Sequence, residues 1–391
     1  MQTYYADLHI HIGRTEEGKA VKISGSRNLT FHNIAKEASE HKGMDIVGII
    51  DCHSPGVLQE IEHYLDKGTM EELPGGGIRY HQSTVILGSE IEVRDPGMGP
   101  AHVLAYFPML DMMKEFSSWM SRHMKNIQLS SQRIYVPARQ LQQEIIDRGG
   151  LIIPAHIFTP HRSVYGSCTD RMAHLLDLAN VPAVELGLSS DSAMAGLISE
   201  LTPMTFLTNS DAHSLGKIGR EYNQLSLEQP TYIELMKAIQ RMDGRKVLAN
   251  YGLNPRLGKY HRTYCRGCGS IIDDHEAVSV ERCSYCGSLR IVRGVMDRIQ
   301  DIADLHQPAM PDYRPPYHYQ VPLEYIPGIG PKKLKDLLAH FQTEMNILHR
   351  VKLDDLSTVI GFEAAELILK AREGRLELES GGGGTYGKIT R

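Results

Sequence analysis

The stretch YYADLHIHIG, residues 4–13, places two histidines, His9 and His11, one residue apart behind an aspartate, Asp7. On a β-strand, residues i and i+2 lie on the same face, so both imidazoles point in one direction. The stretch fits two explanations: a pair of ordinary core or surface histidines, or half of a metal site. The second explanation requires further ligands elsewhere in the chain.

The composition is that of a globular chain with room for more than one ordinary domain. It has 391 residues, of which 41% are hydrophobic and 23% are charged. No apolar run approaches the ~18–20 residues of a membrane span, and the N-terminus lacks a signal pattern. We therefore expect a cytoplasmic protein with no membrane partner. The formal net charge of −5 excludes a basic surface over the whole protein, so nucleic acid would be held by local features or by metal ions.

Seven short apolar runs that end in polar residues occur between residue 1 and about residue 250. They span residues 3–12, 44–54, 84–93, 102–108, 149–158, 181–190 and 204–214. Helical patterns lie between several of them, as in residues 30–43 and 138–150, and each pattern ends at glycine. This alternation predicts an α/β fold with a mostly parallel sheet, which we expect to form a distorted seven-stranded (β/α) barrel. The carboxyl ends of barrel strands carry the chemistry.

Histidines and carboxylates gather at the ends of these runs, and the pattern D-x-H recurs as DLH, DCH and DAH. The residues concerned are His9, His11, Asp51, His53, Glu90, Glu92, His102, His156, Asp211 and His213. A mixture of imidazole and carboxylate favours divalent transition metals, and one carboxylate can bridge two ions ~3.5–4 Å apart. Any single histidine has an ordinary structural explanation, but the convergence of the whole set favours a metal cluster.

The motifs ADLHIHIG, IIDCHSP, GSEIEV, HVLAYF, IIPAH and NSDAHS together resemble the PHP (polymerase and histidinol phosphatase) family, from residue 1 to about residue 250. The resemblance implies a seven-stranded barrel that binds two or three divalent ions (Zn, Mn or Mg) and hydrolyses phosphoesters. It assigns catalysis to His9, His11, Glu90, His102, His156 and Asp211.

The same match divides the metal ligands among three ions. The first ion would take His9, His11, Glu90 and Asp211, the second Glu90, His102 and His156, and the third His53 and His213. Asp7 and Asp51 would orient the histidines from behind. Many members of the family have another histidine about six residues after the first pair, where this chain has Glu16 and Glu17.

Four of the six cysteines form the pattern C-x2-C-x14-C-x2-C, namely Cys265, Cys268, Cys283 and Cys286, whereas Cys52 and Cys168 stand alone. Two thiolates on each of two tight turns make a closed tetrahedral site, so we expect one structural zinc. A redox pair is the alternative, although redox motifs do not usually come doubled at this spacing. The arginines around the cysteines either contact phosphates or form a solvated face.

The segment YIPGIGPKKLKDLL, residues 325–338, sets Gly328 and Gly330 before a helix start, with Lys332 and Lys333 beside it. Glycines let a ligand approach the backbone closely, and a helix N-terminus presents N–H groups to phosphate. The segment resembles a helix-hairpin-helix motif, which binds the DNA backbone, and a weaker second copy surrounds Gly361. An ordinary helix turn with a glycine cap is the alternative for both copies.

Taken in this order, the parts resemble the endonuclease Q family over nearly the entire chain. We expect a PHP metallo-phosphoesterase barrel (1–255), a four-cysteine zinc-binding domain (256–298), a linker rich in Pro and Tyr (299–322) and a helix-hairpin-helix DNA-binding domain (323–391). The resemblance implies a DNA repair endonuclease that cuts 5′ of a deaminated base (uracil, hypoxanthine, xanthine) or an abasic site, by hydroxide activated at several metal ions. Such an enzyme would associate with the nucleoid and could have a replication or repair protein as partner.

A nuclease that reads a base must extrude it from the stack, and a deaminated base presents a carbonyl acceptor in place of an amino donor. His161, Arg162 and Tyr165 are the candidates for the base pocket, with an ordinary barrel loop as the alternative. Other functions also stay open. They are a PHP-type 3′–5′ exonuclease, a small-molecule phosphate monoesterase of the histidinol-phosphatase type, and a non-catalytic damage-binding protein.

Overall fold

The computed structural model describes residues 1–272, 280–379, 381, 385 and 387–390. Each of the seven apolar runs contains a β-strand, and helices lie between several of the strands, so the α/β class is confirmed. The strands are β1 (Gln2–Ile10), β2 (Ile46–Ile49), β5 (Ser83–Val93), β6 (Ala101–Phe107), β7 (Leu151–Pro154), β8 (Ala183–Glu185) and β9 (Thr205–Leu207).

The strands do not all run in the same direction. β1, β2 and β5 are parallel neighbours, whereas β6 is antiparallel to both β5 and β7. The prediction of a mostly parallel sheet is therefore wrong: β6 is antiparallel to both of its neighbours, and the strands at residues 78–80 and 222–227 also pair antiparallel with β5 and β1. Residues 94–100, which join β5 to β6, are too few for the crossover helix that parallel neighbours need. The reversal places His102, at the amino end of β6, opposite Glu92 near the carboxyl end of β5.

Backbone hydrogen bonds connect the remaining strands to this sheet. β8 and β9 form a parallel pair of their own. The Ile157 N–H donates to the Glu185 carbonyl at 3.0 Å, which joins the segment after β7 to β8. The His11 N–H donates to the Ala212 carbonyl at 3.0 Å, which joins the segment after β9 to β1. These bonds bring the polar residues that follow β1, β7, β8 and β9 close to one another.

A buried apolar cluster holds the seven strands together, since each strand contributes a side chain to it. Its members include Leu8, Ile46, Ile86, Leu104, Ile153, Ala183 and Leu207. Burial of apolar surface contributes about 25 cal/mol per Å² and is not directional. The precise placement of the strand ends therefore depends on polar contacts outside this cluster.

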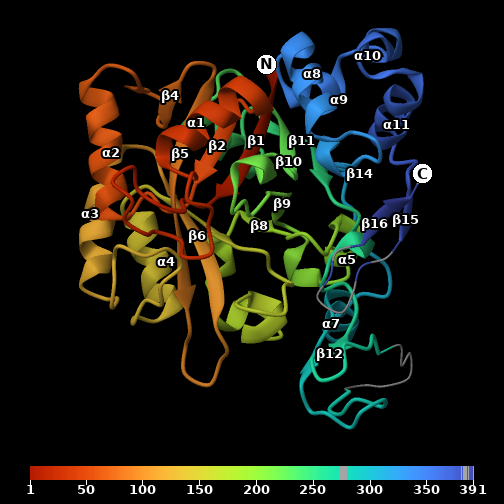
Figure 1. Cartoon of the computed structure of the whole chain (residues 1–391). Helices are drawn as coiled ribbons and strands as arrows, with labels where there is room; N and C mark the ends of the chain where they lie inside the picture. Colours follow the sequence, from red (N-terminus) through yellow and green to blue (C-terminus); the bar gives the residue numbers. More distant parts are fainter. Residues whose placement is uncertain (273–279, 380, 382–384, 386, 391) are drawn as a thin grey trace.

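Helices cover the outside of the sheet, and Figure 1 shows α1 to α4 on one side of it. The helices of this part are α1 (Phe31–Glu37), α2 (Pro55–Asp66), α3 (Leu110–Ser121), α4 (Ala138–Asp147), α5 (Ser192–Ala195) and α6 (Tyr232–Gln240). The expected helical stretches 30–43 and 138–150 contain α1 and α4. Helix α1 begins after Thr30, whose Oγ1 accepts from the Asn33 N–H at 3.3 Å. Its π-helical continuation, Ala38–Lys42, ends at Gly43 with φ +74°.

Further strands extend the sheet at both edges. They are β3 (Glu71–Glu72) and β4 (Ile78–Tyr80) beyond β5, and β10 (Tyr222–Leu227), β11 (Lys246–Gly252) and β14 (Tyr317–Tyr319) beyond β1. β14 belongs to the segment 299–322, which was predicted to be a linker. The segment begins within a helix that ends at Ile302, and its later part packs on the sheet instead of acting as a spacer. Arg314, for example, is buried 3.3 Å from the ring centroid of Phe206 and donates to the Met204 carbonyl at 2.6 Å.

The last third of the chain forms two further regions, which Figure 1 shows below and beside the sheet. Their elements are β12 (Tyr264–Cys265), β13 (Ile291–Val292), α7 (Val295–Ile302), α8 (Pro331–Phe341), α9 (Glu344–His349), α10 (Leu353–Ile360), α11 (Phe362–Arg372), β15 (Glu377–Glu379) and β16 (Lys388–Thr390). Among the described residues, no helix is long and apolar enough to cross a membrane.

An aromatic contact joins α9 to the outer face of the sheet. His349 stacks on Tyr5 with ring centroids 4.7 Å apart, and its Nε2 lies 2.7 Å from the Tyr222 hydroxyl. Burial lowers the pKa of His349 to about 4, with help from Arg372 and Arg350. The ring is therefore neutral near pH 7, and one hydrogen bond joins its Nε2 to the Tyr222 hydroxyl.

A buried ion pair fastens the same two regions. Lys42 donates from Nζ to Glu344 Oε1 at 2.8 Å and to the Gly216 carbonyl at 2.8 Å. Both charged side chains are buried, so neither has water as a substitute partner.

Replacing Lys42 by methionine leaves the Glu344 carboxylate buried without its ammonium partner. We expect this change to reduce the free energy of unfolding by about 3–5 kcal/mol, visible as a lower melting temperature in calorimetry. Lys114→Met breaks an exposed pair with Glu62 and is the matched control, with an expected loss below about 1 kcal/mol. Equal losses in the two variants would contradict the role given to the buried pair.

Candidate metal centre

The paired histidines of β1 are each held from behind by a carboxylate. His9 Nδ1 lies 2.9 Å from Glu185 Oε2, and His11 Nδ1 lies 3.0 Å from Asp51 Oδ2. All four side chains are buried. A carboxylate on one ring nitrogen fixes the tautomer and the ring orientation, and it leaves the other nitrogen available to a metal ion. The Nε2 atoms of both histidines therefore face the same space.

That space is shared with two carboxylates. His9 Nε2 lies 3.6 Å from Glu90 Oε1 and 3.5 Å from Asp211 Oδ1. His11 Nε2 lies 3.6 Å from Glu90 Oε2 and 3.4 Å from Asp211 Oδ1. Two ligands that each lie ~2.0–2.2 Å from one ion are separated by roughly this distance. The structure thus brings together the four residues that the sequence assigned to the first ion.

Two further groups adjoin the first. Glu90 Oε1 lies 2.8 Å from His102 Nδ1 and 3.3 Å from His156 Nε2, which matches the set assigned to the second ion. His213 joins His11 and Asp211, with ligand atoms within 4.8 Å of one another. Glu90 and His11 each belong to two groups, so the three groups form one continuous cluster.

The donors of this cluster fit divalent metal ions. His9 Nε2, which faces Glu90 and Asp211, is buried and lacks a hydrogen-bond partner among the described residues. A buried polar atom without a partner costs free energy, and a metal ion is a partner that imidazole and carboxylate share. The described cluster therefore has the ligand chemistry of a centre with two or three ions.

His53 is a predicted ligand that the structure does not bring into these groups. Its Nδ1 lies 2.8 Å from Ser89 Oγ, and its Nε2 lies 3.4 Å from the Leu129 carbonyl. Both ring nitrogens thus have protein partners. Glu16 and Glu17 do not join these groups either, since Glu16 Oε1 accepts from the Tyr64 hydroxyl and Glu17 pairs with Lys19 at 2.8 Å. The third group consists of His213 with His11 and Asp211.

The residues behind the ligands differ in part from the prediction. Asp51 orients the His11 ring, as expected. Asp7, in contrast, accepts from the backbone N–H groups of Ser210 at 3.0 Å and Gly219 at 2.8 Å, so it holds a loop and not an imidazole. Sequence reasoning missed Glu185, which holds His9. The feature of the sequence that could have identified Glu185 is its position directly after the apolar run VPAV.

Lys22 is a second residue that sequence reasoning missed. Its Nζ lies 3.3 Å from Glu90 Oε2 and 2.6 Å from Ser131 Oγ. The sequence around Lys22 has no pattern that singles it out, because its position depends on the loop that follows β1. It supplies a positive charge beside a fully buried carboxylate.

Two of the ligands have a strained backbone. His156 has φ +30° and Asp211 has φ +47°, in the left-handed region that side chains other than glycine seldom adopt. Such conformations cost about 1–3 kcal/mol each and persist where the surrounding structure enforces them, most often at functional sites. His156 follows β7 by two residues and reaches Glu90, whereas Asp211 follows β9 by four residues and reaches His9 and His11.

The charges of the cluster are strongly coupled. Burial raises the pKa of Glu90, but His102 and Lys22 outweigh it and hold that pKa well below its usual range. Burial lowers the pKa of His9, but Glu185, Asp211 and Glu90 together raise it to about 10. The carboxylates thus attract a positive charge to this point, which is what a site for a dication requires.

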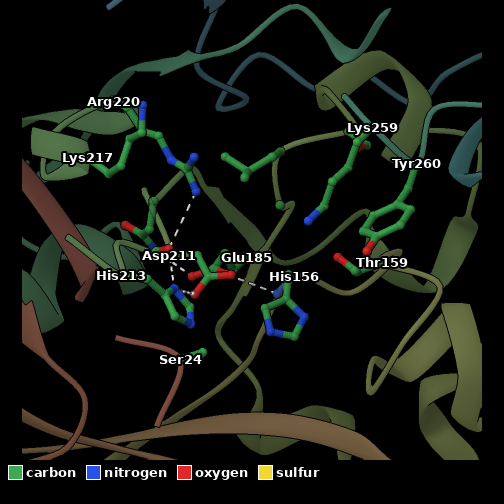
Figure 2. A pocket seen from close by; sticks show the side chains of 14 residues that line it. Ser24, His156, Thr159, Glu185, Asp211, His213, Lys217, Arg220, Lys259 and Tyr260 are labelled. Carbon is green, nitrogen blue, oxygen red and sulfur yellow. Dashed lines mark hydrogen bonds and ion pairs between the residues drawn. The ribbon is translucent and has the colours of Figure 1, made fainter. Parts of the chain in front are cut away.

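A cavity of about 380 Å³ opens beside the cluster. Figure 2 shows His156, Asp211 and His213 on its floor, with Lys217 and Arg220 on one side and Lys259 and Tyr260 on the other. Cationic side chains above a metal cluster suit an anionic substrate such as a phosphate ester.

The three candidates for the base pocket do not line this cavity. Tyr165 is buried, stacks on Phe158 and donates to Glu200 Oε1 at 2.7 Å, so its assignment is wrong. Arg162 pairs with Glu92 at 3.2 Å. His161 is exposed and meets Tyr260, a residue of the cavity wall, edge-on with ring centroids 5.6 Å apart.

The four clustered cysteines come together as one group. The Sγ atoms of Cys265 and Cys286 are 3.6 Å apart, and those of Cys268 and Cys283 are 3.7 Å apart. Thiolates ~2.3 Å from a tetrahedral zinc ion are roughly 3.8 Å apart, so the set fits zinc. Cys52 and Cys168 are buried singly, as expected.

The segment predicted to be a helix-hairpin-helix motif contains a glycine turn followed by a helix. Gly328 has φ +84°, and Gly330 is the N-cap of α8, which begins with Pro331, Lys332 and Lys333. At the weaker predicted copy, Gly361 lies between α10 and α11 with φ +85°. Gly328 and Gly330 have open space where a side chain would be, so the backbone there is accessible.

Comparisons with known proteins agree with this geometry. A scan against models of protein families finds no match. "Uncharacterized protein YqxK" of Bacillus subtilis is 52% identical over 392 aligned positions and covers all of both chains. The lesion-specific endonuclease PfuEndoQ from Pyrococcus furiosus matches with a TM-score of 0.85 and 32% identity, covering 99% of this chain and 95% of that one. A structure of endonuclease Q with a 27-mer duplex carrying an abasic lesion matches with a TM-score of 0.84 and 32% identity, covering 99% and 96%.

Glu90→Gln removes a carboxylate that two ligand groups share. We expect the affinity of this site for divalent metal to fall by about a hundredfold or more. Loss of a residue that only orients a ligand already costs about tenfold to a hundredfold. Elemental analysis after dialysis measures the loss. Glu92→Gln, two residues further along β5 and paired with Arg162, is the control and should retain its metal.

Cys283→Ser should remove one equivalent of zinc from the purified chain and leave the metal of the barrel in place. The matched control is Cys168→Ser, which changes a buried cysteine outside the group of four. Full zinc content in Cys283→Ser would refute the four-cysteine site.

Proposed function

The chain belongs to the endonuclease Q family of DNA-cleaving enzymes, and we propose that it cuts the phosphodiester bond 5′ of deaminated bases (uracil, hypoxanthine, xanthine) and of abasic sites. The observation that carries the proposal is the match over 99% of the chain to a lesion-specific endonuclease. An abasic duplex occupies the active site of a second matching structure. The metal centre and the cationic cavity beside it are consistent with a substrate that has a phosphate backbone.

We infer that the parts of the chain divide this work. The proposed distorted seven-stranded PHP barrel (1–255) would carry the reaction, and the four-cysteine zinc ribbon (256–298) would stiffen a DNA-contacting region. The packed segment 299–322 would connect it to the helix-hairpin-helix region (323–391). In that region Gly328, Gly330, Lys332 and Lys333 would hold the DNA backbone without reading its sequence. A replication or repair protein as partner stays a prediction.

Two or three divalent ions would be held by His9, His11, Glu90, His102, His156, Asp211 and His213. When bound, such ions activate water near neutral pH and offset charge on the phosphate. Asp51 and Glu185 would fix the rings of the first two histidines, so that the scissile phosphate meets a rigid ligand set. Lys22 would balance the charge of Glu90. The 3′ oxygen of the preceding nucleotide would leave.

The cavity beside the cluster is the proposed place of the extruded nucleotide. Damaged and mispaired bases need the least energy for extrusion. Deamination leaves a carbonyl acceptor where cytosine or adenine has an amino donor. Thr159, Ser189 and Lys259 line the cavity and offer donors to such a carbonyl. This set replaces the candidates that the sequence suggested.

Cleavage of a labelled duplex with one internal deoxyuridine tests the proposal. We expect a single product that ends 5′ of the lesion, formed with Mg²⁺ or Mn²⁺ and abolished by EDTA, and no product from undamaged duplex. Asp211→Asn should reduce cleavage by at least about 10²-fold while DNA binding persists. Asp111→Asn, an exposed residue on α3, is the matched control.

Other outcomes separate the alternatives. A ladder of products from one end would indicate a 3′–5′ exonuclease, and turnover of a small phosphate monoester without any cut in damaged duplex would indicate a monoesterase. Either result would withdraw the endonuclease proposal.

A further inference from the structure

The loop between β9 and β10, residues 208–221, carries a lysine that faces the cavity. Asp211 and His213 of this loop belong to the metal centre, and Lys217 lines the cavity four residues further on. Figure 2 shows Lys217 beside Arg220, above Asp211 and His213. A cation at this position lies where a substrate phosphate would approach the cluster.

Residues that precede the DNA-binding hairpin hold this lysine. Lys217 donates from Nζ to Glu324 Oε1 at 2.6 Å and to the Tyr325 hydroxyl at 2.8 Å, and Nζ lies 4.4 Å from the Tyr325 ring centroid. Glu324 and Tyr325 belong to the 3₁₀ turn Leu323–Tyr325, directly before the segment that contains Gly328. One cation of the cavity is therefore paired with the entrance of the hairpin.

The loop does not depend on this pair for its position. The buried ammonium of Lys42 already holds the Gly216 carbonyl at 2.8 Å and pairs with Glu344 in the helical region. By contrast, the side chains of Lys217 and Glu324 are 31% and 36% exposed. A partly exposed ion pair contributes little to stability, so another anion can replace Glu324 at low cost.

We propose that Lys217 is a phosphate-binding residue for the DNA substrate and that Glu324 occupies its ammonium until DNA arrives. This inference rests on the proposed function. A DNA phosphate would replace the Glu324 carboxylate as the partner of Lys217, while the ring and hydroxyl of Tyr325 keep the ammonium in place. A small anion that binds alone gains only the contact with Lys217, and it must displace Glu324 to make that contact. DNA also contacts the hairpin, so its phosphate reaches Lys217 at a high effective concentration.

The consequence is selection against short or isolated phosphates. Glu324 competes with any anion that enters the cavity, and only a substrate long enough to reach both the cavity and the hairpin overcomes the competition. Lys217 is thus assigned to substrate binding, and Glu324 to control of its availability.

Steady-state cleavage of an abasic duplex, measured over roughly 50 to 200 mM salt, tests this assignment. Lys217→Met should raise KM and make log(1/KM) less steep against log[salt] by about 0.9, the amount for one lost phosphate contact. Glu324→Gln should lower KM about two- to fivefold with kcat unchanged, as expected for release of a partly exposed ion pair. In the Lys217→Met background, Glu324→Gln should have no effect on KM.

A structural tether would give a different set of results. Both single variants would then raise KM and lower the melting temperature together, and the salt slope would not change; this outcome overturns the inference. Lys114→Met is the matched control and should leave the slope as in the parent chain. If the parent chain cuts no damaged duplex, the proposed function fails and this inference fails with it. If the parent chain cuts and Lys217→Met keeps the parental slope, only this inference fails.

Discussion

Glu90 lies buried near the carboxyl end of β5, with its two oxygens 2.8–3.6 Å from imidazole nitrogens of His9, His11, His102 and His156. A carboxylate in this position is costly unless positive charge surrounds it. Histidines from three separate segments surround Glu90: His9 and His11 on β1, His102 on β6, and His156 after β7. The strained backbone at His156, the carboxylates behind His9 and His11, and the ammonium of Lys22 all follow from this requirement for positive charge. Metal ions would satisfy the same requirement, which is why the arrangement suits a metallo-phosphoesterase.

Much of this centre is visible in the sequence, because the ligands follow strands and the side-chain period of a strand is two. The patterns H-x-H and D-x-H and the acidic residue after the run TVILGS pointed to His9, His11, Glu90 and Asp211, and the resemblance to the PHP family assigned them to one ion. Glu185 was missed because its partner His9 is 176 residues away, and nothing near VPAVEL predicts that contact. The sequence also does not show that His53 bonds to the protein and not to a metal ion, since this depends on where the loop that contains Leu129 lies.

The errors have physical reasons of their own. Tyr165 lies in a polar loop, but a short π-helical turn, Val164–Cys168, carries it into the core against Phe158. The direction of β6 depended on a seven-residue connection and not on the strand pattern itself. The segment 299–322 has the composition of a spacer, and composition cannot tell which surface will receive it. For Tyr165 and for the segment 299–322, a tertiary contact overrode a local preference.

The stacking of His349 between tyrosines of the sheet has a consequence for how such chains change over generations. The outer face of the sheet at Tyr5, Tyr222 and Tyr251 is aromatic, and α9 covers it with a neutral histidine that is hydrogen-bonded to the Tyr222 hydroxyl. Without the helical region this aromatic face would be exposed to water. A substitution on either side of the contact therefore alters the surroundings of the other, so that changes at His349 and at these tyrosines are coupled.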